Sequence, residues 1–177
     1  MTRRRSQAGQ SLAEFALVAP IFFLLVFAVI QIGLVFAAQN GLVDGVRSAA
    51  RRAATYRINE QSFNASVFPT ICTAIATELD DRLAGRQGQD LVVGYQSGNL
   101  TRTISYEWIQ NPEGGDYFLV AHITARYKAQ LYVPLVSNLI DQDANRGDGF
   151  LEISASEQMR VENPPLDTPA SLTARTC

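Results

Sequence analysis

Histidine and cysteine are scarce in this chain, and their scarcity limits the chemistry that it can perform. The 177 residues include one histidine and two cysteines. No nucleophile elbow, zinc-protease helix, phosphate-binding loop or Cys-X-X-Cys pair occurs. The single histidine, His122, falls on the polar face of a predicted strand, where we expect an exposed sheet residue and not a catalytic base. The sequence therefore predicts a protein that is not an enzyme.

The two cysteines, Cys72 and Cys177, allow a single intramolecular pairing. If this part of the chain lies outside the cytoplasm, the compartment favours a disulfide. A bond that closes a loop of this length would stabilise the fold by roughly 3–5 kcal/mol. The alternative is a pair of free thiols, one of them buried in a helix.

Charge is absent from one long stretch and unequally divided over the rest. Residues 15–38, FALVAPIFFLLVFAVIQIGLVFAA, contain no charged side chain. Residues 1–57 carry seven arginines against two acids, and residues 58–177 carry fifteen acids against eight bases. Basic residues on both sides of an apolar helix suit phospholipid headgroups, whereas the acidic remainder argues against a nucleic-acid surface. We therefore expect a membrane as partner and no nucleic acid.

The apolar run fits a membrane-spanning helix better than a cleaved secretory signal. Such a signal has an apolar core of about 7–15 residues followed by a small-residue cleavage site. Here the run is longer and continues into a further helical pattern. At about 1.5 Å per residue it covers roughly 36 Å, enough for a hydrocarbon core of about 30 Å. The flanking arginines are nearly balanced, so they do not set its orientation.

A short pattern ahead of the apolar run points to proteolytic processing. An arginine-rich leader ends at Gly9, and Gln10, Glu14 and Phe15 follow it. With the apolar run and the Ala/Arg-rich segment GVRSAARRAATY, this spacing resembles the TadE-like family of Flp/Tad pilus-assembly pseudopilins, which are type IV prepilin-like proteins. The resemblance covers roughly residues 8–57.

The resemblance implies a processing step, a location and a set of partners. A prepilin peptidase would cut between Gly9 and Gln10. The chain would lie in the bacterial cytoplasmic membrane as a single-pass protein, with its N-terminus inside and its head in the periplasm or outside the cell. Its protein partners would be other pilins or pseudopilins of the Tad machinery. It would act in pilus assembly, and so in adhesion and surface attachment, either in the pilus or at its base.

Glu14 is the charged residue nearest the start of the apolar run. The resemblance implies that its carboxylate pairs with the new α-amino group at Gln10, or with that of a neighbouring subunit. Such a pair would offset the desolvation of both charges. The alternative is a carboxylate that stays solvated at the headgroup level, where a charge costs much less free energy than at the bilayer centre.

Helical periodicity continues beyond the apolar run. We expect one helix over residues 10–57, spanning the membrane at about 15–38 and forming a stalk after it. The stalk carries a single apolar stripe, which consists of Leu42, Val46, Ala49, Ala50 and Ala53. The stripe is expected to pack against the chain's own domain, and a helical pilus core is a second, compatible partner.

The rest of the chain predicts an α+β head, the general plan of pilin-like heads. A second amphipathic helix is expected from about Pro69 to Leu83, with Gly85 placed to end it. Four antiparallel strands are expected from alternation, at residues 91–95, 103–109, 117–127 and 151–156. The resulting organisation is a leader at 1–9, the helix at 10–57, an extracytoplasmic head at 58–162 and a Pro-rich extended tail at 163–177.

One acidic loop resembles a calcium site. Asp141, Asp143, Asn145 and Glu152 have the spacing of oxygen ligands in a calcium loop. Arg146, however, occupies the position where that loop needs glycine. A turn without metal is the alternative, so calcium is only a secondary expectation and no other cofactor is expected.

Three hypotheses about function follow from the sequence. The first is a Tad-type minor pilin or pseudopilin. The second is an uncleaved, signal-anchored envelope protein whose head binds a ligand or a partner protein. The third, an exported enzyme, lacks a recognisable catalytic set.

Overall fold

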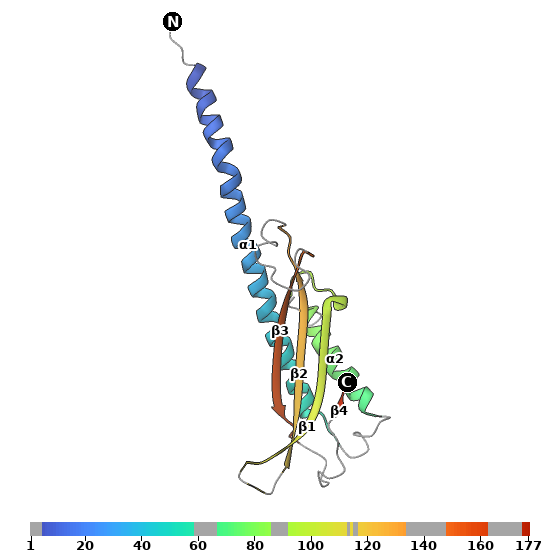
Figure 1. Cartoon of the computed structure of the whole chain (residues 1–177). Coiled ribbons are helices and arrows are strands. Elements are labelled where there is room, and N and C mark those ends of the chain that lie inside the picture. The colour runs from blue at the N-terminus through green and yellow to red at the C-terminus, as the bar shows by residue number, and fades with distance from the viewer. Residues whose placement is uncertain are drawn as a thin grey trace. The chain divides into compact units, whose positions relative to one another are not determined.

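The computed structural model describes residues 5–58, 67–85, 92–112, 114, 117–133, 148–162 and 175–177, with side chains from residue 9 onward. Two helices precede a sheet in chain order (Figure 1). The chain divides into two compact units, Met1–Val35 with Gln130–Leu151 and Phe36–Ala129 with Glu152–Cys177. The predicted α+β class is confirmed.

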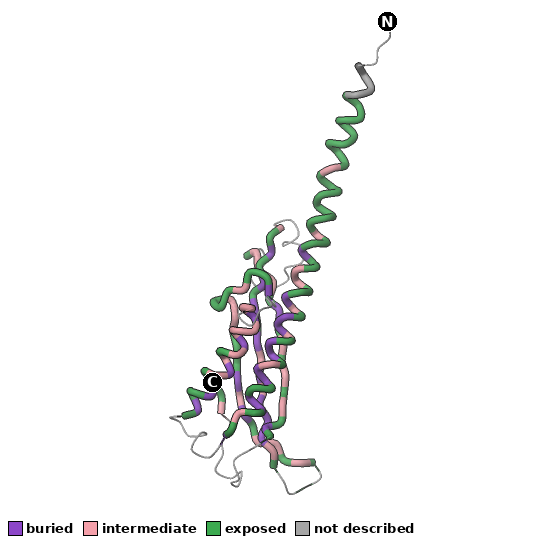
Figure 2. Tube along the Cα trace, turned by 180° about the vertical axis from the view of Figure 1, so that it is seen from behind, coloured by how far each residue is buried: buried purple, intermediate pink, exposed green. Residues whose placement is uncertain are grey.

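Helix α1 runs from Arg5 to Thr55 and begins five residues before the expected start at Gln10. Its second part buries the predicted stripe, because Leu42, Ala49 and Ala53 have no exposed surface and Val46 has 1%. Figure 2 shows the same change along the helix, from exposed residues near the N-terminus to a buried stripe farther on. The apolar stripe of the stalk is therefore confirmed.

Helix α2 extends over Phe68–Leu83, and it packs closely against α1. A Cβ atom built on Gly45 would lie 3.0 Å from Cδ2 of Leu83 and 3.2 Å from Cδ1 of Leu79. The helices can approach this closely because Gly45 has no side chain. The buried stripe of α2 contains Ile71, Ile75, Leu79 and Leu83, and Gly85, with φ of 68°, follows the end of the helix.

The sheet has four strands in the order β3-β2-β1-β4. Their bounds are Leu100–Gln110 for β1, Tyr117–Gln130 for β2, Phe150–Arg160 for β3 and Arg175–Thr176 for β4. A 3-10 helix, η1, precedes β1 at Ser97–Asn99. Strand β1 is antiparallel to both β2 and β4. The alternation that predicted a strand at residues 117–127 is confirmed, because its alternate residues Leu119, Ala121, Ile123, Ala125 and Tyr127 are all buried.

Within the second unit, α2 and the part of α1 that follows Val35 cover one face of the sheet (Figure 1). The ring of Phe68 on α2 makes an edge-to-face contact with that of Tyr106 on β1, with centroids 5.9 Å apart. Gln39 of α1 donates to the backbone oxygen of Ser154 on β3 at 3.0 Å. The buried core of this unit therefore lies between the helices and the sheet.

One of the expected strands is wrong. Residues 92–95 form a turn and not a strand, because Gly94 has φ of 69° and the Tyr95 amide donates to the Val92 carbonyl at 3.2 Å. The fourth strand comes instead from the end of the chain, where Arg175–Thr176 pairs with Ser105 and Tyr106. Arg175 and Thr176 therefore belong to the sheet, and residues 163–174 of the predicted tail lie outside the described residues.

Candidate processing site and membrane helix

The first part of α1 presents apolar side chains on all sides. Thirteen large apolar residues between Leu12 and Ile30 are exposed, from 37% for Val26 to 72% for Leu17. By length and composition, the helix at Gly9–Thr55 can cross a membrane. Apolar surface of this extent is unfavourable in water, so lipid or another apolar partner is needed to cover it.

The predicted processing residues lie together on α1. Gly9, Gln10, Glu14 and Phe15 are all exposed, and Phe15 is 67% exposed. The side-chain Nε2 of Gln10 donates to Oε1 of Glu14 at 3.2 Å. Residues four apart in a helix share a face, so the Glu14 carboxylate lies over the turn that contains residue 10.

The Gly9–Gln10 bond lies inside the helix, since α1 begins at Arg5. Proteases cut extended chain, so cleavage there requires this first part of the helix to unwind. Gly9 lowers the free energy needed, because glycine in a helix interior is about 1 kcal/mol less stable than alanine. A Cβ atom at Gly9 would meet nothing within 4 Å, so no packing reason accounts for the glycine.

Gln31 is a buried polar residue that the sequence reasoning missed. It has 1% exposure, and its Oε1 accepts a hydrogen bond of 2.8 Å from the backbone amide of Tyr132. Its Nε2 is buried and has no acceptor among the described residues. The signal was in the sequence, because Gln31 is the only side chain with a hydrogen-bonding group between residues 15 and 38.

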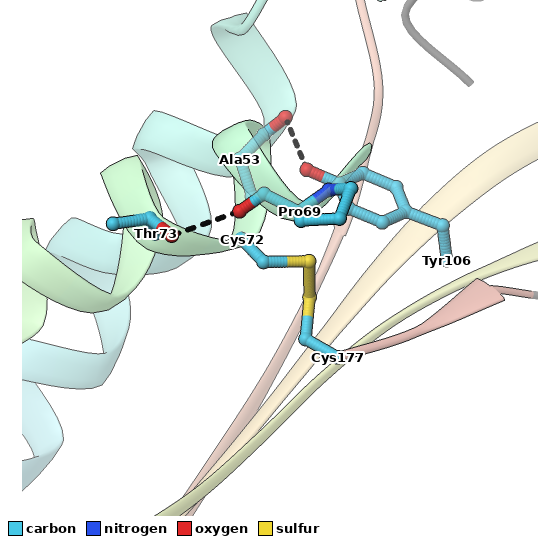
Figure 3. Close-up of a disulfide and its surroundings, with 6 residues drawn as sticks. All are labelled: Ala53, Pro69, Cys72, Thr73, Tyr106 and Cys177. Atoms are coloured by element: carbon cyan, nitrogen blue, oxygen red, sulfur yellow. Dashed lines mark hydrogen bonds between the residues drawn. A yellow bond between two sulfur atoms is a disulfide. The ribbon is translucent and has the colours of Figure 1, made fainter. Parts of the chain in front are cut away.

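The predicted disulfide is present between Cys72 on α2 and Cys177, with Cα atoms 5.9 Å apart (Figure 3). Next to it, a cavity of about 270 Å³ is lined by Thr73, Ala76 and Thr77 of α2 and by Arg102 and Ile104 of β1, besides the two cysteines.

The Arg102 guanidinium in the wall of this cavity is paired with the Asp80 carboxylate at 2.7 Å. The Tyr95 hydroxyl donates to the same carboxylate at 2.6 Å, and burial and this bond raise the pKa of Tyr95. This polar cluster connects α2 to the sheet.

The calcium prediction falls mostly outside the described residues, which do not include Asp141, Asp143 and Asn145. Glu152, the fourth residue, lies on β3 with its carboxylate 3.5 Å from the Arg126 guanidinium. Among the described residues, no three His, Cys, Asp or Glu side chains are placed to hold a metal ion. Calcium binding therefore stays a prediction.

His122 lies on β2, with Nε2 3.7 Å from the Glu107 carboxylate of β1. The His122 side chain is 24% exposed. It is therefore more covered than the exposed sheet residue that we expected from the sequence. The two side chains form a contact between neighbouring strands on one face of the sheet.

Comparison with known proteins gives a family match, and it falls on α1. Residues 9–51 match the TadE-like protein family. The matching segment, called the TadE-like segment below, begins at Gly9 and ends at Arg51, and it contains the exposed apolar part of α1, Glu14 and the start of the buried stripe. It covers 43 of the 177 residues. No curated protein and no solved structure matches the chain.

The TadE-like segment is similar to the corresponding part of Tad pilus-associated proteins, and its helix is suited to membrane anchoring. The resemblance to the TadE-like family is thereby confirmed for this segment. The sheet and α2 lie outside the match, so their contribution to function has to be argued from their own geometry.

Proposed function

We propose that this chain is a Tad-type minor pilin or pseudopilin that is cut between Gly9 and Gln10. The observation that carries the proposal is the start of the TadE-like segment at Gly9, the residue before the expected cleavage. In the proposed topology, α1 anchors the chain in the bacterial cytoplasmic membrane with the leader inside. The rest of the chain then lies in the periplasm or outside the cell and takes part in assembly of a pilus, without a catalytic role.

The exposed apolar part of α1 suits both the membrane-anchored state and the assembled state of such a protein. Before assembly, lipid covers the thirteen exposed side chains. During assembly, apolar surfaces of other pilins or pseudopilins take the place of lipid. The transfer requires no exposure of this surface to water, because both environments are apolar.

The Gln10–Glu14 contact supports the proposed role of the carboxylate. Cleavage would create an α-amino group at Gln10, on the turn over which the Glu14 carboxylate already lies. Glu14 would then lie about one helical turn from the N-terminus of the shortened helix. The charge of Glu14 is thereby stabilised within the chain, and a neighbouring subunit's α-amino group provides an alternative partner.

The mature N-terminus is the test of the cleavage. We expect the chain to begin at Gln10 in cells that contain prepilin peptidase and to retain residues 1–9 in cells that lack it. Gly9→Leu should block cleavage in the cells that contain the peptidase, and Gly33→Leu, elsewhere in the helix, is the matched control that should be cleaved. A leader that is retained in every strain would overturn the proposal and leave the uncleaved, signal-anchored protein with a partner-binding head.

The role of Glu14 needs its own test. Glu14→Ala should be cleaved normally, because the peptidase acts at Gly9, and it should lose piliation. Gln10→Ala removes the side-chain contact but keeps the new α-amino group, so it should retain piliation. Normal piliation of Glu14→Ala would remove the assembly role from this carboxylate without affecting the cleavage.

A further inference from the structure

The end of β2 is attached to α1 within the first unit. The Leu131 amide donates to the Gly149 carbonyl at 2.8 Å, and the next amide, of Tyr132, donates to Oε1 of Gln31 at 2.8 Å. Leu131 is buried at 6% exposure, whereas the Tyr132 side chain is 54% exposed. Two successive amides of segment 131–133 are therefore hydrogen-bonded, and the segment presents the Tyr132 side chain to the surroundings.

Protein cover of α1 begins at this attachment. Between residues 9 and 30, the only residues that are not exposed are Ala19 and Ala28, which are half-buried. Gln31 is then buried, and Leu34 and Val35 are half-buried. The attachment thus lies at the position where α1 ceases to be exposed on all sides.

The uncovered part of α1 has the length of a membrane span. Residues 10–30, with Glu14 about one turn from their first residue, extend over about 31 Å at 1.5 Å per residue, close to the hydrocarbon thickness of about 30 Å. A span in this position places Gln31 and segment 131–133 at the boundary between acyl chains and headgroups. Tyrosine is enriched at that depth, because its ring is apolar and its hydroxyl is polar.

We propose that segment 131–133 is a membrane-contact surface that places the Tyr132 side chain among the phospholipid headgroups of the leaflet next to the head. The proposal rests on the membrane anchoring in the proposed function, but not on the pilus role. Gln31 holds the segment at this depth, since its Oε1 satisfies the Tyr132 amide where water is scarce. The membrane span is then 10–30 and not 15–38.

Depth-dependent quenching in nanodiscs tests the contact on the full-length chain. Trp108→Phe first removes the single native tryptophan, whose Nε1 is buried without an acceptor among the described residues. Single tryptophans are then introduced by Tyr132→Trp, by Phe22→Trp within the span, and by Tyr117→Trp. Tyr117 is the matched control because it is 43% exposed and lies at the opposite end of β2. Each protein is placed in phosphatidylcholine brominated either near the headgroup or near the acyl-chain ends.

The proposal predicts that Tyr132→Trp loses emission mainly with bromine near the headgroup. Phe22→Trp should lose it mainly with bromine near the chain ends, and Tyr117→Trp should keep its emission with both lipids. A Tyr132→Trp protein that is unquenched while Phe22→Trp is quenched would overturn the membrane contact and leave the anchor intact. An unquenched Phe22→Trp would instead overturn the anchor itself and this proposal with it.

The role of Gln31 is tested by a matched pair of substitutions in the Tyr132→Trp protein. Gln31→Met keeps the side-chain length but removes the acceptor, so the preference for bromine near the headgroup should be lost. Gln31→Glu keeps an oxygen at the same position and should retain that preference. A preference that persists in Gln31→Met would remove the positioning role from Gln31. A mobility shift on reduction shows that each variant has formed the Cys72–Cys177 bond.

Discussion

The hydroxyl of Tyr106, in the middle of β1, donates a hydrogen bond of 3.3 Å to the backbone carbonyl of Ala53 in the last turn of α1. The last carbonyls of a helix have no partner within the helix. Here the Glu162 amide, just after β3, donates to the neighbouring Ala54 carbonyl at 3.0 Å. The end of the stalk helix is therefore capped by groups from the sheet side of the fold, and this fixes where α1 ends.

The first prediction concerns this cap. Tyr106→Phe should lower the free energy of unfolding by about 1–2 kcal/mol, because the Ala53 carbonyl is buried and loses its side-chain donor. Tyr117→Phe, at an exposed position, should change it little. Denaturant titration of the full-length protein in detergent micelles, followed by Trp108 fluorescence, measures both. An equal effect of the two substitutions would contradict the cap.

The same tyrosine predicts loss of stability at high pH. Burial raises the pKa of Tyr106 above its ordinary value of about 10. A group whose pKa is raised in the folded state contributes its full stability below the unfolded pKa and loses it as the pH rises above that value. The melting temperature should therefore fall as the pH rises through about 10, and less so in Tyr106→Phe. Parallel curves for the parent and Tyr106→Phe would contradict this origin of the pH dependence.

The helices were predictable from the sequence because their signals are local. The stripe from Leu42 to Ala53 repeats with the period of the helix, and so does the buried face of α2. The strands of the sheet other than β4 were predictable for the same reason, since their apolar residues alternate. The segment 92–95 was not, because a short apolar run does not reveal that Gly94 turns the chain.

Contacts between distant parts of the chain could not be predicted. Strand β4 has two residues and no periodicity of its own, and it forms only because Ser105 and Tyr106 offer it a neighbouring edge. The processing residues, in contrast, lie within seven residues of each other, so their spacing alone made them predictable. Gln31 was visible as an isolated amide in an apolar run, but its partner Tyr132 lies 101 residues away.

The close approach of α1 and α2 gives the third prediction. Gly45→Val should lower the free energy of unfolding by about 1–3 kcal/mol, because even its Cβ atom reaches within 3.0 Å of Leu83. Gly33→Val introduces the same β-branched residue into α1 where nothing lies within 4 Å, so its effect should be much smaller. Denaturation in micelles compares the two. If Gly33→Val were as destabilising as Gly45→Val, helix propensity and not packing would explain both.

The last prediction concerns the disulfide that ties the end of the chain to α2. The Cys177 amide donates to the Ile104 carbonyl of β1 at 2.8 Å, and the Cys177 side chain is bonded to Cys72 of α2. The residue after β4 is therefore attached both to the sheet and to α2. Strand β4 alone buries little, so loss of the bond should release it from β1.

Cys177→Ser should lower the free energy of unfolding by about 3–5 kcal/mol, because it opens a loop of 105 residues. The double variant Cys72→Ser/Cys177→Ser opens the same loop and should be destabilised to the same extent. Hydrogen exchange should show faster exchange of the Cys177 amide in both variants. A parent protein whose gel mobility is unchanged by reduction would contradict the bond. Stability equal to the parent's in both variants would show instead that the sheet holds β4 without it.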